Sequence, residues 1–459
     1  DELISKEDYE KMRKKYEKIC IHKEIDKNYM NISPFEAYMR IRKPYSFLLE
    51  SAEFDKTSKF SFLGVSREQV SLKNKSVEAL KKFVRKKTYF DKNISRFVGG
   101  IVGFVSYDMV RQFEILPRLT SENSIPDALF LVTDDCIVFD HKLKKTYIIV
   151  TLDNHESYQN GKERIDLLEE RLREDKSLKS HENCKEFHSN ISKKEFEEMV
   201  RKAKEYIYTG DIFQVVLSRK IETETDVDPL LIYRSLKRIN PSPYMYFLDF
   251  KDLFIIGSSP EVLVRLEGKK AWVRPIAGTR GRGKTLEEDE LLEREMLSDE
   301  KERAEHVMLL DLGRNDLGRV CGFGSIKVEE FMTVEKYSHV QHLVSSVSGK
   351  LKEGVDAFDL FRATFPAGTV SGAPKIRAME IIEELEKERR GPYAGGVGYF
   401  SYNGNMDFAI TIRTLIVNEN KITAQGGAGI VADSDPEREY HETEKKLEAL
   451  RKAVWEAQK

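Results

Sequence analysis

Apolar and polar positions alternate differently along the chain, and these changes predict where helices and strands lie. In the first thirty residues Tyr9, Met12, Tyr16 and Cys20 recur at helical spacing among charged residues, which predicts a charged helix. Farther along, short apolar runs separated by turn residues are typical of strands in a sheet. These runs are 47–49, 60–64, 97–104, 128–132 and 147–150.

A highly charged stretch from Asp153 to about Lys193 is the best candidate for a domain boundary. It contains one amphipathic helix, predicted around residues 165–172, followed by polar residues. We therefore divide the sequence into an N-terminal region, residues 1–180, and a C-terminal region, residues 181–459. The charged stretch need not separate two independent bodies.

The C-terminal region combines helices with an antiparallel meander. The pattern predicts a helix over 194–208, strands around 215–217 and 253–256, and one long acidic helical region over 287–310. Residues 395–432 alternate as strands do, with turn signals at Asn403-Gly404 and at Asn418-Glu419-Asn420. A final helix is predicted from about Pro436 to the end.

Composition and charge exclude several classes of protein. Among 459 residues, 76 Lys and Arg face 78 Asp and Glu, and this balance argues against a general nucleic-acid binder. No run of eighteen apolar residues occurs, so no membrane span is expected, and the acidic N-terminus predicts no signal peptide. Four widely spaced cysteines without a CxxC pair argue against a zinc site and favour a reducing cytoplasm.

Residues 278–285 fit the phosphate-loop pattern GxxxxGK[ST], and 307–311 imitate the strand that carries a Walker B aspartate. A phosphate-loop fold needs parallel strands joined by right-handed crossovers, whereas the C-terminal meander predicts hairpins. The segment that ends at Asp311 also has the pattern of a helix throughout. We therefore interpret the match as accidental, with nucleotide hydrolysis as the minor alternative.

Two pairs of glutamates have a spacing that suits a metal ion. Glu302 and Glu305 are three residues apart on one predicted helix, and Glu439 and Glu442 repeat that spacing on the last helix. Two helices that each present two carboxylates could meet around a hard cation such as magnesium, which keeps several waters. The alternative is a pair of solvated acidic faces.

Nearby segments favour the metal interpretation. Residues 366–375 and 426–429 are rich in small residues, which allow backbone N–H groups to approach an anion closely. Arg413 lies on a strand predicted over 409–417, where an inward side chain could clamp a carboxylate and an outward one would be solvated. Together the segments suggest a magnesium site for a small polyanionic carboxylate.

Five separated motifs carry a resemblance to a known family. The chain resembles the chorismate-utilising enzymes, and within them the large subunits (component I) of anthranilate synthase, over roughly Lys43 to Ala449. The resemblance implies an α+β fold with two packed, largely antiparallel β-sheets and helices on the outside. The motifs span 275–280, 299–316, 368–379, 391–399 and 433–442.

Two positions separate the branches of this family. Isochorismate and salicylate synthases carry a water-activating lysine where this chain has Gln214, and a neutral amide cannot act as that base. Aminodeoxychorismate synthases carry a nucleophilic lysine where this chain has Ala277. The resemblance therefore implies direct attack by ammonia and the ortho product, anthranilate, with aminodeoxychorismate synthase as the alternative.

The resemblance also implies roles for individual residues. Glu305 and Glu442 would hold Mg²⁺, with Glu302 and Glu439 reaching it directly or through water. The implied catalytic residues are the general acid Glu261, the elimination-step His342, Thr369 and Gln214. The implied substrate-binding residues are Tyr393 and Arg413, which would grip the enolpyruvyl carboxylate, and Gly278, Thr279, Gly427, Ala428 and Gly429. Taken alone, Glu261 could be a solvated loop carboxylate and His342 a core histidine.

A feedback site and a partner are implied as well. The N-terminal region would contribute Leu49, Glu50 and Ser51 to a tryptophan site, facing a second wall of Pro243, Tyr244 and Met245. A structural strand end and a proline turn would give the same sequence. No cysteine has the Gly-x-Cys-x-Gly context of a glutaminase nucleophile, so a separate glutamine amidotransferase subunit (component II) or free ammonia is expected. A catalytically inactive tryptophan-binding protein is the alternative from another class.

Overall fold

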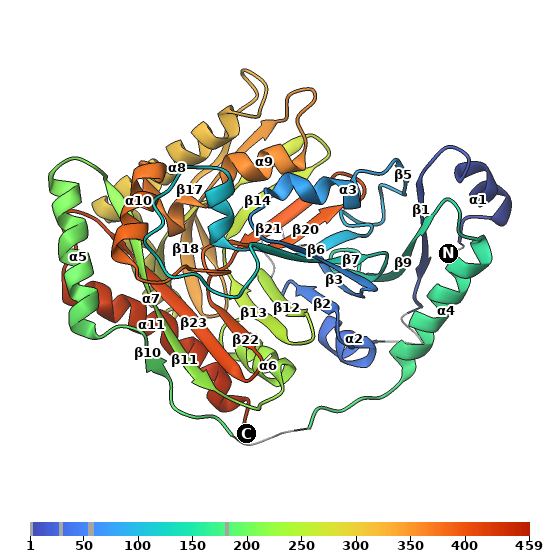
Figure 1. Ribbon diagram of the computed structural model, residues 1–459, viewed down its shortest axis with the longest axis horizontal. Coiled ribbons are helices and arrows are strands. Elements are labelled where there is room, and N and C mark those ends of the chain that lie inside the picture. Colours follow the sequence, from blue (N-terminus) through green and yellow to red (C-terminus); the bar gives the residue numbers. More distant parts are fainter. Residues whose placement is uncertain (1–2, 27–30, 54–58, 180–182) are drawn as a thin grey trace.

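Two large β-sheets pack face to face, and helices cover their outer sides. The computed structural model describes residues 3–26, 31–53, 59–179 and 183–459. In Figure 1, α8 and α9 lie over the smaller sheet, whereas α5, α6 and α11 lie along the larger one. Phe62 of the larger sheet meets Tyr399 of the smaller sheet, with ring centroids 5.6 Å apart, so aromatic side chains fill the space between the sheets.

Both sheets are almost entirely antiparallel, since β1 with β5 is the only parallel pair among the described strands. The 13-stranded sheet contains β1 Lys18–Glu24, β2 Ser46–Glu50, β3 Phe60–Val65, β5 Thr88–Tyr89, β8 Asp135–Asp140, β9 Lys145–Asp153, β10 His188–Ser189, β11 Gln214–Glu224, β12 Tyr244–Asp249, β13 Leu253–Ser259, β19 Gly372–Ala373, β22 Thr414–Asn418 and β23 Lys421–Ile430. The 10-stranded sheet contains β4 Glu68–Leu72, β6 Gly100–Val105, β7 Ala128–Thr133, β14 Val262–Glu267, β15 Lys270–Val273, β16 Ile276–Gly281, β17 Lys327–Lys336, β18 Val340–Lys350, β20 Gly396–Ser401 and β21 Met406–Ile410.

The N-terminal and C-terminal regions build both sheets together. In the larger sheet β2 pairs with β12, and in the smaller sheet β6 pairs with β20. Strands from both sides of residue 180 therefore share hydrogen-bonded sheets. The division of the chain at this residue stays a prediction. The predicted apolar runs are confirmed as strands, except that residues 97–99 precede β6. Residues 395–432 also form strands, with the predicted hairpins at Asn403-Gly404 and after Asn418. The prediction of a single meander is wrong, because β20 and β21 belong to the smaller sheet and β22 and β23 to the larger one.

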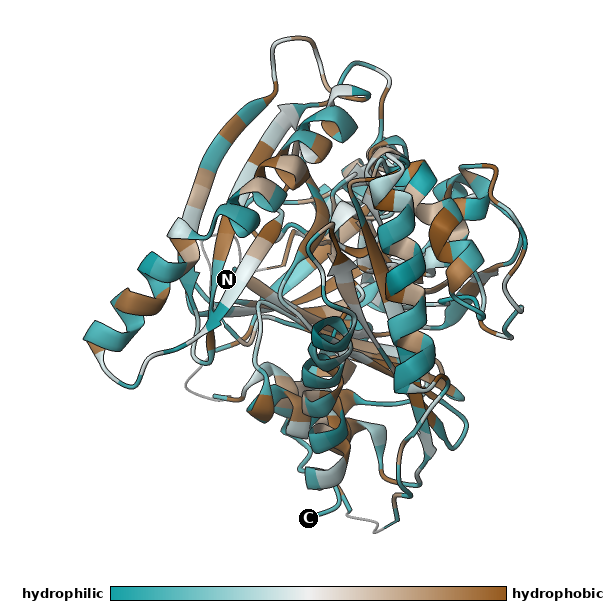
Figure 2. Cartoon of the chain, turned by 90° about the vertical axis from the view of Figure 1, so that its left-hand side faces the viewer, coloured by the Kyte–Doolittle hydropathy of each residue, from teal (hydrophilic) through white to brown (hydrophobic). Residues whose placement is uncertain are grey.

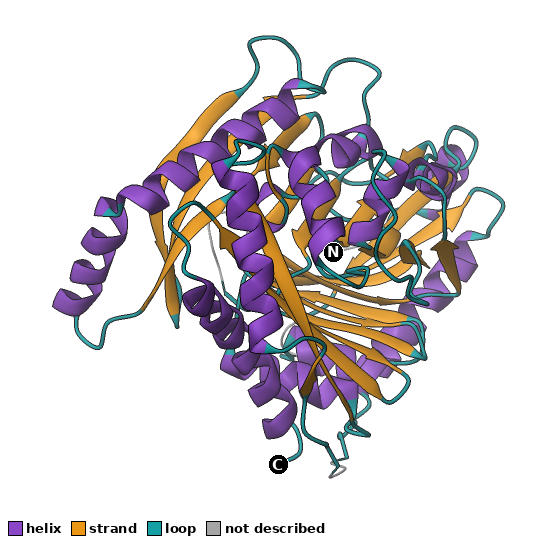
Figure 3. Ribbon diagram, turned by 60° about the vertical axis from the view of Figure 1, so that its left-hand side comes forward, coloured by secondary structure: helices purple, strands orange, loops and turns teal. Residues whose placement is uncertain are grey.

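Amphipathic helices close the outer faces. α2, α4, α6 and α11 bury apolar residues against the larger sheet, and a separate core lies under α5 and α10. The helices in Figure 2 carry both brown and teal positions, and Figure 3 shows the strands at the centre with helices around them. The helices are α1 Lys6–Met12, α2 Pro34–Ile41, α3 Lys81–Val84, α4 Tyr158–Arg173, α5 Lys193–Tyr208, α6 Pro229–Ile239, α7 Leu286–Ser298, α8 Glu300–Gly318, α9 Ala357–Thr364, α10 Lys375–Leu385 and α11 Pro436–Glu456, with short 3₁₀ helices η1 Val77–Leu80, η2 Tyr107–Gln112 and η3 Gly368–Val370.

The prediction of one helix over the first thirty residues is wrong. α1 ends at Met12, and Lys18–Glu24 forms strand β1, which pairs with β9 over its whole length. The helical spacing of Tyr16 and Cys20 is overridden because long-range pairing decides the conformation of short apolar segments. Residues 27–30 lie outside the described part.

The acidic region over 287–310 forms two helices instead of one. α7 ends at Ser298, and Asp299 starts α8 by accepting a hydrogen bond from the backbone N–H of Glu302, at 3.0 Å. The helical interpretation of residues 307–311 is confirmed, and β16 pairs antiparallel with β18. The phosphate-loop match is therefore accidental.

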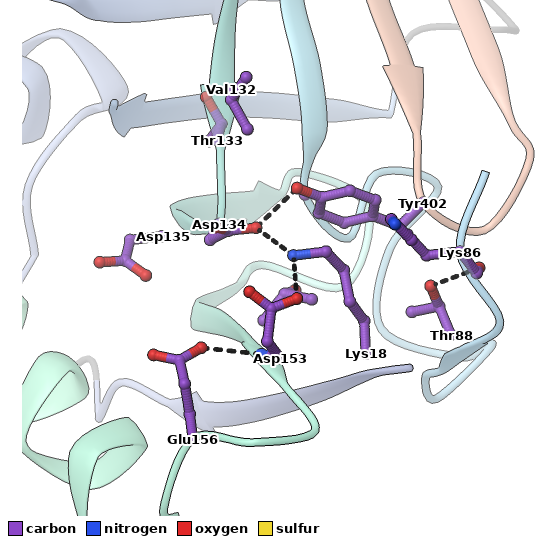
Figure 4. Close-up of polar contacts among 12 residues, drawn as sticks. Lys18, Lys86, Thr88, Val132, Thr133, Asp134, Asp135, Asp153, Glu156 and Tyr402 are labelled. Carbon is purple, nitrogen blue, oxygen red and sulfur yellow. Dashed lines mark hydrogen bonds and ion pairs between the residues drawn. The ribbon is translucent and has the colours of Figure 1, made fainter. Parts of the chain in front are cut away.

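An ion-pair cluster around the buried Lys18 joins the two sheets. Lys18 of β1 is 6% exposed, and its Nζ lies 3.2 Å from Asp134 and 3.1 Å from Asp153. The Tyr402 hydroxyl donates to the same Asp134 carboxylate at 2.7 Å, and the Lys18 ammonium lies over the Tyr402 ring (Figure 4). The cluster thus connects β1 to the β20–β21 hairpin.

No helix in the described part of the chain is both long and apolar enough to cross a membrane.

Candidate active site

Glu261 is a buried carboxyl in the connection between β13 and β14. It is 6% exposed, and the Thr369 hydroxyl on η3 donates a hydrogen bond to its Oε1 at 3.1 Å. Burial raises the pKa of Glu261 to about 8, and Glu305 adds to the rise while Thr369 and Arg413 oppose it. The carboxyl is therefore protonated at neutral pH and can serve as a general acid.

His342 on β18 is held in its neutral form. Its Nδ1 lies 2.9 Å from the Thr279 hydroxyl on the paired strand β16. Burial lowers the pKa of His342 to about 4, and the nearby positive charge of Arg413 contributes to this. A neutral imidazole at this position can accept a proton.

Arg413 is a central charge of the site. The sequence predicts that it lies within a strand, but the structure places it between two strands. β21 ends at Ile410 and β22 begins at Thr414, so the predicted strand 409–417 is broken at Arg413, whose φ is +51°. Left-handed backbone costs a residue with a side chain about 1–2 kcal/mol, and such strain gathers at functional sites. The Arg413 carbonyl accepts from the Ser258 N–H at 3.1 Å, which helps to hold this conformation.

Arg413 also links the predicted groups electrostatically. Burial lowers the pKa of its guanidinium, and Tyr393, Glu442 and Glu261 oppose that change. The structure therefore brings together a cation, the general acid and one carboxylate of the last helix. The Tyr393 hydroxyl borders the same space, since a Cβ added at Gly427 would lie 2.6 Å from it.

The two glutamate pairs lie on helices α8 and α11, which both approach Arg413 and Glu261. The space between these groups is called the chamber below. The Gln214 amide donates to Glu305 at 3.0 Å, and Arg280 donates to Glu302 at 2.7 Å. Burial raises the pKa of Glu439, and Glu442 and Glu305 both contribute to the rise. The carboxylates are therefore close enough to repel one another in the absence of a cation.

Oxygen atoms beside the two glutamate pairs are of the kind that a magnesium ion takes as ligands. The Glu302 Oε2 and Gln214 Oε1 atoms are buried and have no hydrogen-bond partner among the described residues. Within the described residues, no three His, Cys, Asp or Glu side chains form a ready-made metal cluster. Magnesium is usually held by one or two carboxylates, with waters and substrate oxygens in its other positions.

Lys446 belongs to the chamber and was missed in the sequence. Its Nζ donates to the Gly427 carbonyl at 2.7 Å. Burial, followed by the charge of Arg413, lowers the pKa of Lys446 to about 8, against the opposite influence of Glu442, Glu439 and Glu305. Lys446 follows Glu442 by four residues on one helix, so the two side chains share a face, and this spacing could have indicated its place in the site.

Small residues shape the walls of the chamber. A Cβ at Gly278 would lie 2.8 Å from Glu302 Oε2, and one at Gly429 would lie 2.6 Å from the Gln214 amide nitrogen. Ala428 differs from its neighbours, because its methyl group packs in the core under α5 and α10. Only the backbone of Ala428 can therefore face the chamber.

The six residues predicted for tryptophan line one pocket between the sheets, together with Phe62 and Tyr399. The Ser51 hydroxyl joins the two walls by donating to the Pro243 carbonyl at 3.0 Å. The Glu50 carboxylate points to α6, where it accepts hydrogen bonds from Tyr233 at 2.6 Å and Lys237 at 2.7 Å. The six are Leu49, Glu50, Ser51, Pro243, Tyr244 and Met245.

Charged residues in this pocket were also missed. Arg265 and Asp407 face the pocket from β14 and β21, with Arg265 Nε 3.1 Å from the Asp407 carboxylate. The Tyr244 hydroxyl donates to Asp407 at 3.1 Å and accepts from Arg265 at 2.7 Å. No local sequence pattern marks these residues, because only sheet pairing brings β14 and β21 together.

Comparison with known proteins identifies the family of the chain. Residues 54–452 match the family described as chorismate binding enzyme. Anthranilate synthase component 1 of Aquifex aeolicus (strain VF5) is 44% identical over 98% of this chain and 97% of that protein, and the Acetivibrio thermocellus protein of the same name is 48% identical over 90% of each.

Solved structures show the same fold. The crystal structure of anthranilate synthase component I from Streptococcus pneumoniae TIGR4 has a TM-score of 0.80 at 38% identity and covers 91% of this chain and 97% of that one. The menaquinone-specific isochorismate synthase MenF from Escherichia coli has a TM-score of 0.76 at 19% identity, covers 98% of each chain, and shares the fold. The chain therefore belongs to the chorismate binding enzyme family, and its relatives in that family include component 1 proteins of anthranilate synthase.

Proposed function

We propose that the protein converts chorismate and ammonia into anthranilate, pyruvate and water, as the first committed step of tryptophan biosynthesis. The observation that carries this proposal is the buried Glu261, whose pKa of about 8 keeps a proton available beside Arg413. The names of the relatives support the same reaction, because they are component 1 proteins of anthranilate synthase.

Substrate binding uses the cations and the paired glutamates. Arg413 and Tyr393 would hold the enolpyruvyl carboxylate, since a buried guanidinium favours a carboxylate partner. Glu305 and Glu442 would hold magnesium, with Glu302 and Glu439 directly or through water. When bound, Mg²⁺ offsets the negative charge of the ring carboxylate during the displacement. Lys446 adds a second positive charge on the same side.

In the first step, ammonia attacks C2 of the ring and the 4-hydroxyl leaves as water. Glu261 donates the proton that the leaving oxygen needs, while Thr369 orients the carboxyl through its hydrogen bond. The ammonium nitrogen formed at C2 then loses a proton to become an amine. In the second step, neutral His342 removes the C2 proton, the bond between C3 and the enolpyruvyl oxygen breaks, and the ring becomes aromatic. The departing enolpyruvate takes up a proton at its methylene carbon and becomes pyruvate.

Gln214 and Ala277 favour ammonia over water and over a protein nucleophile. The Gln214 side-chain amide donates a hydrogen bond to Glu305, and it has no basic nitrogen with which to activate water. Ala277 has no amine to form a covalent adduct with the ring. The ortho product, anthranilate, follows from direct attack at C2.

We also propose tryptophan as a feedback inhibitor in the pocket of Leu49 and Met245. A free amino acid needs partners for its carboxylate and ammonium groups, and Arg265 and Asp407 supply opposite charges at one end of this pocket. Phe62 and Tyr399 offer aromatic surface for an indole ring. Because the pocket lies between the two sheets, its occupation would alter how they pack.

Ammonia would come from glutamine through a separate amidotransferase subunit, in a hetero-oligomer located in the cytoplasm. The component 1 designation of the relatives supports a second component. All four cysteines lie in the described residues and are free, as suits a reducing compartment.

The testing experiment is a fluorescence assay of the purified chain with chorismate, ammonium and magnesium, with and without tryptophan. We expect anthranilate emission that requires magnesium and falls when tryptophan is added. Unconsumed chorismate would contradict the proposed reaction, and a para-amino product would instead support aminodeoxychorismate synthase. Replacing ammonium by glutamine should abolish the signal until an amidotransferase subunit is supplied.

A further inference from the structure

Arg390 is a fully buried arginine beneath the active site, and no step of the proposed reaction uses it. The residue is 3% exposed and follows α10. Its guanidinium forms a two-pronged ion pair with Glu386, in which Nε and the second terminal nitrogen each lie 2.9 Å from a carboxylate oxygen. A buried pair of this kind is costly to desolvate, so its net contribution to stability is small.

The remaining donors of Arg390 reach two segments that carry active-site residues. One terminal nitrogen donates to the Val370 carbonyl on η3 at 2.6 Å, next to Thr369. The other donates to the Val216 carbonyl on β11 at 2.8 Å, two residues after Gln214. A single guanidinium therefore fixes the backbone of both segments.

Glu386 and the Arg390 ring contacts extend this arrangement. Glu386 accepts hydrogen bonds from both the N–H and the hydroxyl of Ser218, each at 2.9 Å, which anchors β11 a second time. The Arg390 guanidinium also lies over the Tyr393 ring, 5.5 Å from its centroid. Three separate segments that bear Gln214, Thr369 and Tyr393 thus converge on one ion pair.

We propose that the Arg390–Glu386 pair is a positioning device for the reaction, which sets the Thr369 hydroxyl against Glu261. The pair touches no reacting atom. It acts through the Val370 carbonyl, because η3 consists of only Gly368–Val370 and a shift of that carbonyl moves Thr369 with it. This inference rests on the proposed function.

The test measures the pH dependence of kcat for Arg390→Lys. Lysine keeps the charge but cannot bond Glu386 at two points and two carbonyls at once. We expect kcat to fall about 100-fold, as for a displaced catalytic group. We also expect the alkaline limb of the profile to move to higher pH, because the Thr369 hydrogen bond lowers the pKa of Glu261 and would be weakened. Arg413 and Glu305, which also face Glu261, are unchanged in the variant.

Two further variants make the result specific. Thr369→Val should move the alkaline limb in the same direction, and the double variant should lose much less activity than the product of the two single losses. Arg389→Lys is the matched control, since Arg389 pairs with Glu122, which belongs to none of these segments. The kcat of this variant and the alkaline limb of its pH profile should equal those of the wild type.

The outcomes separate this proposal from the proposed function. A wild-type chain that makes no anthranilate contradicts the function. An active wild type with an unmoved limb in Arg390→Lys, or with independent losses in the double variant, overturns the positioning role. Should Arg390→Lys fail to fold, Glu386→Gln carries the same test, because it keeps the side-chain shape while removing the charge that aligns the guanidinium.

Discussion

Burial is the largest influence on the pKa of Glu261, and replacement of this residue makes a two-part prediction. Glu261→Gln should lower kcat about 1,000-fold, because the amide cannot deliver a proton to the leaving oxygen. In the wild type, kcat should fall as the pH rises through about 8, where the buried carboxyl loses its proton. Steady-state anthranilate formation from pH 6 to 9.5, compared at equal ammonia concentration, checks both statements.

The same variant predicts a change in stability whose sign follows from the pKa. A carboxyl with a raised pKa in the folded state binds its proton more tightly there than in the unfolded chain. The favourable contribution of this carboxyl to folding stability is complete below its pKa in the unfolded chain. It is lost as the pH rises through its pKa in the folded protein, about 8. The melting temperature of Glu261→Gln, relative to wild type, should therefore increase from pH 5 to pH 9. A constant difference across that range would contradict a buried, protonated Glu261.

Gly278 is a residue whose lack of a side chain has a direct structural reason. Its φ is +81°, and a Cβ there would lie 2.8 Å from Glu302 Oε2. Gly278→Ala should destabilise the fold by about 1–2 kcal/mol through left-handed strain and should raise the magnesium concentration needed for half-maximal activity. Gly281→Ala on the same strand is the control, since an added Cβ meets nothing within 4 Å. Equal magnesium curves for the two variants would contradict this reasoning.

Individual site residues could be predicted where they belong to local motifs and not where strands from distant segments supply them. Glu261, His342 and the four glutamates sit in recognisable motifs, and the structure gathers them around one chamber. Arg265 and Asp407 belong to different strands, so their contact depends on sheet pairing that no local pattern shows. Lys446 was accessible in principle, because helical spacing places it on the same face as Glu442.

At the scale of elements, Asp299 divides the acidic region and starts the helix that carries Glu302 and Glu305. Asp299→Ala should cost about 1 kcal/mol of unfolding free energy through loss of the N-cap, and should also weaken magnesium activation as the first turn of α8 frays. Thr285→Ala removes the matching cap of α7, which carries no site carboxylate. Urea unfolding and magnesium titration of both variants check the prediction; similar magnesium responses would contradict it.

Elements with strong periodicity were predictable, and short ones were not. The four strands within residues 395–432 and the helices α4, α5 and α11 follow their hydrophobic patterns. β1 did not, because Tyr16 and Cys20 match helical spacing while pairing with β9 fixes an extended chain. The break at Arg413 escaped for another reason, since left-handed backbone at an arginine is maintained by tertiary contacts such as the bond from Ser258.

At the scale of the whole molecule, the Lys18 cluster ties the first strand to both sheets. Lys18→Met should destabilise the protein by about 1 kcal/mol, because it removes the buried ammonium that pairs with Asp134 and Asp153, whose side chains are 34% and 42% exposed. Catalysis at 25 °C should be unchanged, since the cluster contains no active-site residue. Lys11→Met is the control, because its ion pair with Glu7 is exposed, with side chains 59% and 81% exposed, and its loss should have little effect. Unfolding by urea measures both, and equal midpoints would contradict a structural role for the cluster.

The pairing of β6 with β20 has a consequence for the protein while it is still being made. Residues 100–105 leave the ribosome long before their partners 396–401 exist. At about 5–20 residues per second, the edge of β6 stays uncovered for a time on the order of tens of seconds. A bare apolar edge is a template for aggregation. The nascent chain should therefore depend on chaperones until its C-terminal strands emerge, however stable the finished enzyme is.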